Sequence, residues 1–354
     1  MFDGIINPTL QTFTNLPPLI ADATAKILSR SDVRELSTDA KLLHDRYMTE
    51  DKERNSTYLK GPKDMLAYLS LRFPATYAQL MGALFQIKER IPNWEPKTML
   101  DLGCGPATGM FAAKEVFPSI TTAMGIDRER YFLSIGEELL YESKLDMKAT
   151  WEQKTIPSFL DASQEAKYDL IIISNVLNEL TVELREQLVE KLIECSSGVV
   201  LLLEAGNNRG SQIIQKTAQD LSEKQTLIAP YLNNTFVKKE DFWVHFPQRF
   251  IRPEFQRRIR QSMRESDLMA SDWEEAKYSF VAFGNVPIGN NMYGVCVGAV
   301  QKYHGYITLP VLTADGIQEI KVMKRHKEQY RLAKEIKWGE NIENKEALIF
   351  TPTT

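Results

Sequence analysis

The chain has 354 residues, of which 43% are hydrophobic and 25% are charged, and its formal net charge is -4. This length and composition predict a globular protein with one large domain and an appendage or with two domains, and the charge argues against a surface that binds nucleic acid throughout. No apolar run approaches the roughly twenty residues of a membrane span.

The first residues lack the basic start and apolar core of a signal peptide and the arginine-rich character of a mitochondrial transit peptide. We therefore expect a cytoplasmic protein, with neither a membrane nor DNA as its partner. The three cysteines, Cys104, Cys195 and Cys296, lie far apart and form no C-x-x-C pair. The sequence thus predicts neither a disulfide framework nor a zinc site.

Residues 1–95 are expected to be helical, because apolar side chains recur at helical spacing in several segments. These segments are Ile20–Leu28, Ser37–Tyr47, Asp64–Leu71 and Thr76–Ile91. The sequence predicts an N-terminal helical cap that covers a nucleoside pocket in the next part of the chain.

Residues 96–215 alternate between apolar runs and helical segments, which is typical of βαβ units. The first run, Thr98–Leu102, leads into a glycine-rich turn and then a helix from Met110. Glycines allow the backbone of such a turn to approach a ligand, and the helix start presents free N–H groups. The second run ends in Asp127, which in a βαβ unit lies beside the ribose of a bound nucleoside.

The glycine spacing distinguishes between two nucleoside ligands. The dinucleotide fingerprint is G-x-G-x-x-G, whereas Gly103, Gly105 and Gly109 form G-x-G-x-x-x-G, with Asp101 ahead of them. The D-x-G-x-G pattern and the later acid resemble motif I and the second-strand acid of class I methyltransferases. That resemblance implies a site for S-adenosylmethionine; the alternative is a glycine turn in an α/β domain without a ligand.

The same resemblance implies which residues hold the cofactor. The methionine part is expected near the turn that follows Asp101, and the ribose hydroxyls are expected at Asp127. Arg72 can pair with the cofactor carboxylate or with a surface acid. The full set of expected cofactor contacts is Arg72, Asp101, Gly103, Cys104, Gly105, Asp127, Arg128 and Asn175.

The remaining elements of this region complete the expected sheet. They are a helix over Arg130–Glu142, a strand near Ala149–Trp151, a strand over Tyr168–Asn175, a helix over Glu183–Glu194 and a strand over Gly198–Gly206. The fold class is therefore α/β, with a doubly wound, mostly parallel sheet of the Rossmann-like methyltransferase type. Ligands in such sheets bind at the carboxyl ends of the strands, which here carry Asp101, Asp127, Asn175 and Glu204.

The segment Ser174–Leu180 follows the fourth strand, which faces the methyl group in class I methyltransferases. It contains neither the [DN]-P-P-[YF] turn of many enzymes that methylate base nitrogens nor the Pro-Cys nucleophile of cytosine C5 enzymes. Asn175 can orient an amine or the cofactor, and Glu179 can accept a proton. Alternatively, these two residues are a helix cap and a first-turn acid.

Residues 216–354 are expected to form a C-terminal extension with short strands and two basic runs, Arg249–Arg264 and Lys321–Lys337. The strands are predicted over Phe280–Phe283, Gly294–Val297, Tyr306–Leu309 and Ile317–Val322, with a hairpin turn at Ala314–Gly316. A basic run is more often a solvated helix face than a phosphate-binding track, but two runs in one half of the chain favour an RNA partner. The candidate RNA contacts are Arg257, Arg258, Lys324, Arg325 and Lys327.

A series of motifs in chain order resembles the mitoribosomal small-subunit assembly methyltransferase family, the Rsm22 group. The motifs are Tyr68–Thr76, Leu100–Pro106, Asn175–Leu180, Glu204–Gly206, Trp243–Phe246, Lys277–Phe280 and Tyr330–Gly339. The resemblance implies a methyltransferase domain that binds the small ribosomal subunit and acts in its assembly or on its rRNA. The alternatives are a non-catalytic protein that binds the cofactor and a methyltransferase redirected to a small molecule or a protein.

The family's iron–sulfur cysteines are missing from this chain. Tyr231 follows Pro230 where the family has cysteine, and the W-C-H-F motif is replaced by Trp243–Phe246, in which Val244 takes the place of the thiol. A cluster needs thiolate ligands, so we expect neither an iron–sulfur cluster nor another metal. His245 is then expected to pack or hydrogen-bond in the core.

Overall fold

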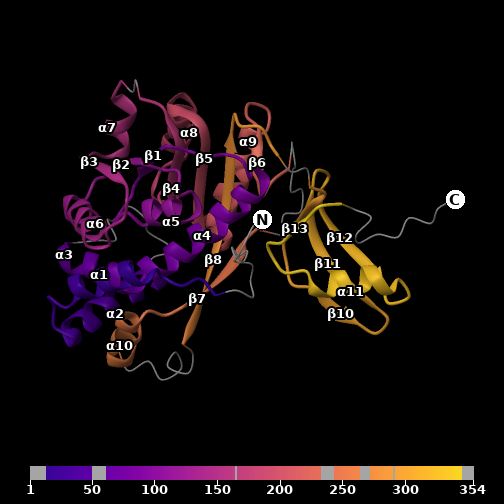
Figure 1. The fold of residues 1–354 in the computed structure, drawn as a ribbon, viewed down its shortest axis with the longest axis horizontal. Helices are drawn as coiled ribbons and strands as arrows, with labels where there is room; N and C mark the ends of the chain where they lie inside the picture. The colour runs from indigo at the N-terminus through magenta and orange to yellow at the C-terminus, as the bar shows by residue number, and fades with distance from the viewer. Residues whose placement is uncertain are drawn as a thin grey trace.

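The computed structural model describes residues 13–49, 61–163, 166–232, 243–263, 272–289 and 292–344. They form an α/β fold with an eight-stranded sheet and a second, five-stranded sheet nearer the C-terminus (Figure 1). The fold class predicted from the sequence is confirmed. None of the helices in these ranges combines the length and the apolar character needed to cross a bilayer.

Helices precede the first strand, as the apolar periodicity predicts. They are α1 (Pro18–Leu28), α2 (Val33–Thr49), α3 (Pro62–Leu71) and α4 (Phe73–Arg90). Three of them, α1, α3 and α4, have proline in the first two positions, where its missing N–H breaks no intrahelical bond. α4 is buried over almost its whole length, because it packs across one face of the large sheet.

The large sheet has the strand order β3-β2-β1-β4-β5-β8-β6, and β7 pairs with β8. Its strands are β1 (Thr98–Leu102), β2 (Thr122–Asp127), β3 (Lys148–Gln153), β4 (Tyr168–Ser174), β5 (Ser196–Ala205), β6 (Leu227–Ala229), β7 (Phe246–Ile251) and β8 (Trp273–Gly284). β1 to β5 run parallel, and β8 is antiparallel to β5, β6 and β7. The strand order reverses between β1 and β4. In open α/β sheets the crevice for a ligand is expected at the carboxyl ends of the strands beside such a switch point.

Helices connect these strands on both faces. They are α5 (Thr108–Val116), α6 (Arg130–Glu142), α7 (Ile156–Asp161), the 3₁₀ turn η1 (Leu177–Glu179), α8 (Val182–Cys195), α9 (Asn208–Leu221) and α10 (Glu254–Ser262). The side chains of Thr155, Thr181 and Asn207 cap α7, α8 and α9 by accepting a hydrogen bond from a backbone N–H in the first turn.

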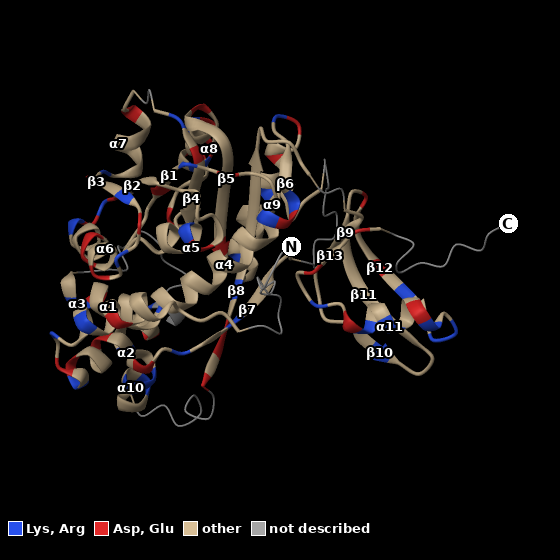
Figure 2. Ribbon diagram, in the orientation of Figure 1, with Lys and Arg blue, Asp and Glu red and all other residues tan. Residues whose placement is uncertain are grey.

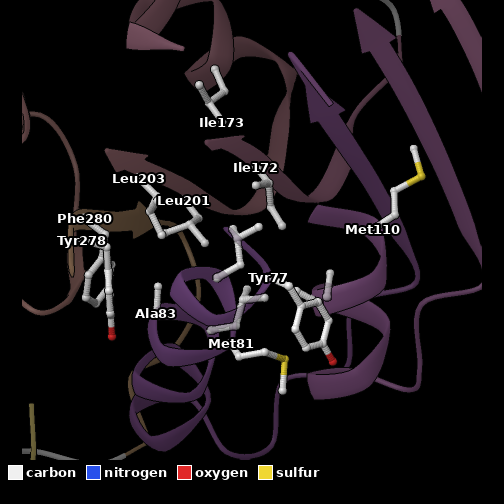
Figure 3. Close-up of a cluster of buried hydrophobic side chains, with 14 of the residues drawn as sticks. Tyr77, Met81, Ala83, Met110, Ile172, Ile173, Leu201, Leu203, Tyr278 and Phe280 are labelled. Carbon is white, nitrogen blue, oxygen red and sulfur yellow. The ribbon is translucent and has the colours of Figure 1, made fainter. Parts of the chain in front are cut away.

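The core lies between α4 and the central strands. In Figure 3, Tyr77 and Met81 of α4 lie against the sheet residues Ile172 and Leu201. β5 is buried on both faces through its apolar run, as expected for a central parallel strand. The long N-terminal helix is therefore part of the main core.

β8 differs from the prediction. Its segment Phe280–Phe283 was expected in a small C-terminal appendage, but β8 lies inside the large sheet between β5 and β6. Periodicity predicts that a strand exists but not which partner it pairs with. Because β6, β7 and β8 complete the large sheet, we propose that the C-terminal unit begins after β8 rather than at residue 216.

The second sheet has the order β10-β11-β9-β13, and β12 pairs with β11. Its elements are β9 (Gly294–Cys296), β10 (Gln301–Tyr303), β11 (Tyr306–Thr313), β12 (Gly316–Met323), α11 (Lys327–Glu335) and β13 (Asn341–Ile342). Thr313 pairs with Gly316, so the predicted hairpin turn at residues 314–316 is confirmed. Two distant motifs meet where this sheet contacts the large one, because Trp338 Nε1 donates to the His245 carbonyl oxygen over 2.8 Å.

Candidate cofactor site

The turn after β1 is held against the end of β2 by its own backbone. The N–H groups of Gly103 and Cys104 donate to the carbonyl oxygen of Ile126, over 2.7 and 3.1 Å. Gly103 and Gly105 have φ values of 72° and 51°, in the left-handed region that favours glycine. A Cβ on Gly103 would collide with Val176, whereas one on Gly105 would meet nothing within 4 Å. The backbone of Gly105 therefore faces open space.

Asp127 is anchored beside this turn. Its Oδ2 accepts from the N–H of Gly105 over 2.8 Å, and its Oδ1 accepts from the N–H of Glu129 over 2.8 Å. Burial raises the pKa of the Asp127 carboxyl, and the two N–H donors lower it in part. A carboxylate offers about four lone-pair sites, so acceptor capacity remains for further donors such as hydroxyls.

Asp101 lies deeper than the sequence analysis expected. Its side chain faces the first turn of α5 and the residue is only 2% exposed. Burial raises the pKa of its carboxyl to about 7, although the backbone N–H groups of Met110 and Gly109 lower it in part. Within the described part of the chain, Asp101 Oδ2 has no hydrogen-bond partner. The Asp101 side chain is therefore buried against the first turn of α5.

Cys104 is also buried within the turn. Burial raises the pKa of its thiol well above the usual value. A protonated, buried thiol is a poor nucleophile, so only the backbone of Cys104 is available to a ligand.

Asn175 ends β4 in a left-handed conformation, with φ of 58°. Its N–H donates to the carbonyl oxygen of Leu203 on β5 over 2.8 Å, and its Nδ2 donates to Ser174 Oγ over 3.1 Å. Asparagine tolerates this conformation better than most residues, so the chain can leave the sheet here and enter η1.

Glu204 ends β5 and is fully buried. Its Oε1 accepts from the backbone N–H of Asn178 over 3.2 Å, and its Oε2 accepts from Asn178 Nδ2 over 2.8 Å. Burial raises the pKa of the Glu204 carboxyl to about 7. The sequence placed Glu204 at a strand end, but nothing in it indicated that Asn178 is its partner.

Arg128 connects the ends of β2 and β4. Its guanidinium lies 3.4 Å from the Glu129 carboxylate and 3.4 Å from the Glu179 carboxylate. All three side chains are partly exposed, so each pair contributes at most about 1 kcal/mol. The ion pair with Arg128 favours a structural role for Glu179 over the role of proton acceptor.

Tyr68 of α3 is a site residue that the sequence analysis missed. Its ring contacts Phe132 of α6, with centroids 5.3 Å apart. Burial raises the pKa of its hydroxyl; Thr76 and Arg72 lower that pKa, and the charges of Asp127 and Glu179 raise it further. These interactions place the junction of α3 and α4, where Arg72 lies exposed, near the ends of β2 and β4. In the sequence, the feature that could have pointed to Tyr68 is its position at the start of the Tyr68–Thr76 motif.

The two basic runs lie on separate parts of the molecule. The first crosses β7 and α10, and the second crosses β12 and α11 (Figure 2). Arg252 and Arg260 of the first run are buried on the carboxylate of Glu274, at 3.2 and 2.9 Å. Arg257 lies 3.7 Å from Asp272, whereas Arg258 is exposed on α10. Arg264 of this run lies outside the described residues.

His245 takes part in packing. Its ring lies 4.7 Å from the ring of Trp338, and burial lowers the pKa of its imidazole. Among the described residues, no three His, Cys, Asp or Glu side chains gather as a metal site would require.

Two cavities lie away from the cofactor site. One, of about 100 Å³, is lined by Arg30, just after α1, and by residues of α1, α3 and α6, including Glu138. The other, of about 720 Å³, lies at the amino end of β5 and is lined by several hydroxyl side chains, including Ser196 and Ser197. The latter cavity is at the opposite edge of the sheet from Asp127.

A family model described as "Mitochondrial small ribosomal subunit Rsm22" matches residues 62–343. These residues include every strand of both sheets.

Curated relatives match at low identity. The human mitochondrial ribosome assembly protein METTL17 is 25% identical over 158 residues, which cover 44% of this chain and 34% of the relative. The Saccharomyces cerevisiae mitochondrial ribosome assembly protein RSM22 is 24% identical over 220 residues, which cover 49% of this chain and 35% of the relative. The matched part is thus about a third of the length of either relative.

Solved structures also align with this chain. The plantazolicin methyltransferase BpumL in complex with S-adenosylhomocysteine is 15% identical, covers 72% of this chain and 98% of its own, and has a TM-score of 0.37. PKMT2 from Rickettsia typhi in complex with the same ligand is 19% identical, covers 43% of this chain and 28% of its own, and has a TM-score of 0.31.

The comparisons contradict the expected cytoplasmic location. The family description and the curated relatives all name mitochondrial proteins. The expectation rested only on signals that the first residues lack, and a missing signal carries no information about where a protein works.

Proposed function

Because the chain belongs to the mitochondrial small ribosomal subunit Rsm22 family, we propose that it binds S-adenosylmethionine and takes part in the assembly of a small ribosomal subunit. The proposed cofactor site lies at the carboxyl ends of β1, β2 and β4. The ribosomal part of the proposal is supported by the family and by the ribosome assembly proteins METTL17 and RSM22.

One observation carries the cofactor assignment. The Asp127 carboxylate is fixed by the Gly105 and Glu129 N–H groups, beside a backbone position where even a Cβ would meet open space. An anchored acid next to bare backbone fits a nucleoside, since the acid accepts from ribose hydroxyls and the backbone approaches the rest of the ligand.

Each predicted cofactor residue then has a defined task. Asp127 accepts from the ribose, and the backbone from Gly103 to Gly105 contacts the methionine part. Arg128 stays beside the ribose through its ion pair with Glu179. Arg72 is exposed and can reach a carboxylate at the crevice. Asp101 supports the turn from behind by binding the start of α5.

S-adenosylmethionine supplies an electrophilic methyl group, so the protein needs mainly to align an acceptor with it. Asn175 stands at the end of β4, and its side-chain carbonyl can accept from an amine while its Nδ2 binds Ser174. We assign it the orienting role and leave Glu179 in its ion pair with Arg128.

A second candidate function is a non-catalytic assembly protein that binds the cofactor as a structural ligand. The segment Ser174–Leu180 favours it, because it supplies no nucleophile and its only acid, Glu179, is ion-paired. Incubation with methyl-labelled cofactor and small-subunit rRNA separates the two functions: transfer of label establishes catalysis, and binding without transfer establishes the structural role.

Calorimetric titration tests the cofactor site directly. Wild type is expected to bind S-adenosylmethionine and S-adenosylhomocysteine with micromolar affinity, and Asp127→Ala is expected to lose that binding. Asp146→Ala, which removes an exposed acid beyond α6, is the matched control and should bind as wild type does. Equal affinities of wild type and Asp127→Ala would contradict the assignment.

A further inference from the structure

Three side chains form a row across one face of the five-stranded sheet. Tyr303 on β10 pairs in register with Tyr306 on β11, and their rings stack with centroids 4.8 Å apart at 18°. Lys321 on β12 continues the row, with its Nζ 3.9 Å from the centroid of the Tyr306 ring. We call these residues the tyrosine row.

The tyrosine row lies on the outer face of the sheet. Alternate residues of β11 and β12, including Ile307, Leu309 and Ile320, point to the other face and pack with Ala333 of α11. Since successive side chains of a strand point to opposite faces, the row is turned away from α11. Figure 1 shows α11 on one side of this sheet only.

Tyr303 is the accessible end of the row. β10 is an edge strand, and Tyr303 is 46% exposed. Its hydroxyl donates to Gln301 Oε1 over 2.5 Å, while Tyr306 supports one face of the ring. Because Tyr306 covers one face of the ring and β10 is an edge strand, we infer that a flat ligand can stack on the other face.

Basic residues surround the tyrosine row. The turn between β10 and β11 is tied to the end of β12, because the Lys324 N–H donates to the Gly305 carbonyl oxygen over 2.8 Å. This contact places the backbone of Lys324 beside the turn that follows Tyr303, and Arg325 is the next residue. Figure 2 shows Lys and Arg segments at the end of β12 and along α11.

The charge of this region is opposite to that of the whole chain. Residues 301–337 contain eight Lys and Arg against four Asp and Glu, a balance of +4, whereas the whole chain carries -4. Among the described residues, no carboxylate lies within ion-pair distance of Lys321, Lys324 or Arg325. The arginines of β7 and α10 differ, since most of them are already paired with Glu274, Glu275 or Asp272.

We propose that the tyrosine row and its basic surround bind an unpaired segment of RNA. A base stacks on Tyr303, and the flanking phosphates contact Lys324 and Arg325. Aromatic stacking accepts any base, and lysine and arginine bind the backbone without reading sequence. The proposal deepens the proposed assembly role by naming single-stranded RNA as the ligand. Duplex RNA would use the charges but not the ring, because its bases are stacked inside the helix.

Fluorescence anisotropy with the full chain and a labelled single-stranded RNA dodecamer tests this proposal. Tyr303→Ala is expected to weaken binding about 5- to 100-fold, the range seen when one stacking ring is removed. Tyr303→Phe keeps the ring and should bind within about twofold of wild type. Tyr141→Ala, which removes a tyrosine that is 81% exposed on α6, is the matched control and should have no effect.

The contribution of the basic residues is tested by measuring the affinity for the same RNA at several salt concentrations. Lys324→Ala should weaken binding and lower the slope of log affinity against log salt by about one, while Tyr303→Ala should leave the slope unchanged. Thermal unfolding of each variant shows whether it is folded.

The results of these experiments distinguish a failure of the RNA site from a failure of the proposed function. Equal affinity of wild type and folded Tyr303→Ala would overturn the stacking site, and so would tighter binding of a duplex of equal length. Displacement of the RNA by poly-glutamate at equal charge concentration would instead identify an acidic protein surface as the ligand. Calorimetric binding of S-adenosylmethionine is measured on the same variants, so a failure of the cofactor site is seen independently of RNA.

Discussion

At the scale of single residues, the acids at the strand ends differ in their surroundings. Two of them, Asp101 and Glu204, are buried, and their contacts differ from those of Asp127. Asp101 and Glu204 face backbone and amide groups of their own chain, and burial raises the pKa of each to about 7. Asp127 is held at the crevice with acceptor capacity to spare. An acid thus supports the turn at the end of one strand, whereas the acid at the end of the next strand keeps acceptor capacity for the proposed ligand.

The raised pKa of Asp101 predicts how stability depends on pH. The folded state keeps a proton on Asp101 up to about pH 7, whereas the unfolded chain releases that proton at about pH 4. The protonated carboxyl therefore contributes fully to stability below about pH 4. This contribution is lost as the pH rises from about 4 to about 7. Asp101→Asn cannot lose this proton, so its free energy of unfolding should rise relative to wild type between pH 4 and 7. Urea denaturation at several pH values measures this, with the exposed Asp146→Asn as a control that should track wild type. A difference that does not change with pH would contradict the prediction.

Two glycines of one motif should respond differently to substitution. An alanine Cβ at position 109 would lie 2.5 Å from Asp101 Oδ2, so Gly109→Ala should lower the free energy of unfolding by about 1–3 kcal/mol. Gly105→Ala meets open space and has only the cost of a left-handed φ, about 1 kcal/mol, but it puts a methyl group where the cofactor is proposed to lie. Denaturation and calorimetry together should therefore find Gly109→Ala the less stable variant and Gly105→Ala the weaker binder.

At the scale of elements, the contact between the two sheets depends on few groups. Trp338, just after α11, donates to the carbonyl oxygen of His245, just before β7, and their rings meet at 4.7 Å. Asn341 of β13 also donates to Glu89 at the end of α4. The Trp338–His245 contact thus joins segments that are 93 residues apart in the sequence.

Substitution of Trp338 tests the strength of this contact. Trp338→Phe removes the hydrogen bond and should lower the free energy of unfolding by about 1 kcal/mol, because the His245 carbonyl loses its donor. Trp338→Ala also removes the ring contact and should cost more, about 2–4 kcal/mol. Chemical denaturation measures both, and Leu332→Ala on the exposed side of α11 should cost less than either. Equal costs for all three variants would show that the contact contributes little.

At the scale of the whole molecule, ligand binding should stabilise the folded chain. A ligand at a hundred times its Kd stabilises the folded state by about 2.7 kcal/mol, so S-adenosylmethionine at that excess should raise Tm by several degrees. The shift should disappear in Asp127→Ala and persist in Tyr303→Ala, because the proposed RNA surface lies on the other sheet. Scanning fluorimetry measures both shifts. An equal rise in Asp127→Ala would place the cofactor elsewhere.

The sequence by itself determined the features that depend on neighbouring residues. The helical periodicity of the N-terminal segments, the glycine turn after β1, the acid at the end of β2 and the hairpin at residues 314–316 are all encoded within a few positions, and the structure has each of them. The family is likewise carried by short motifs in order.

Only the tertiary structure decided which distant groups meet. It inserted β8 between β5 and β6, buried Arg252 and Arg260 on Glu274, paired Glu204 with Asn178, and stacked Tyr303 on Tyr306 beside Lys321. A basic run therefore became an internal salt-bridge network in one place and an exposed surface in another. The physical reason is that burial and pairing depend on the packing of the whole chain, which a local pattern of charge or hydrophobicity does not contain.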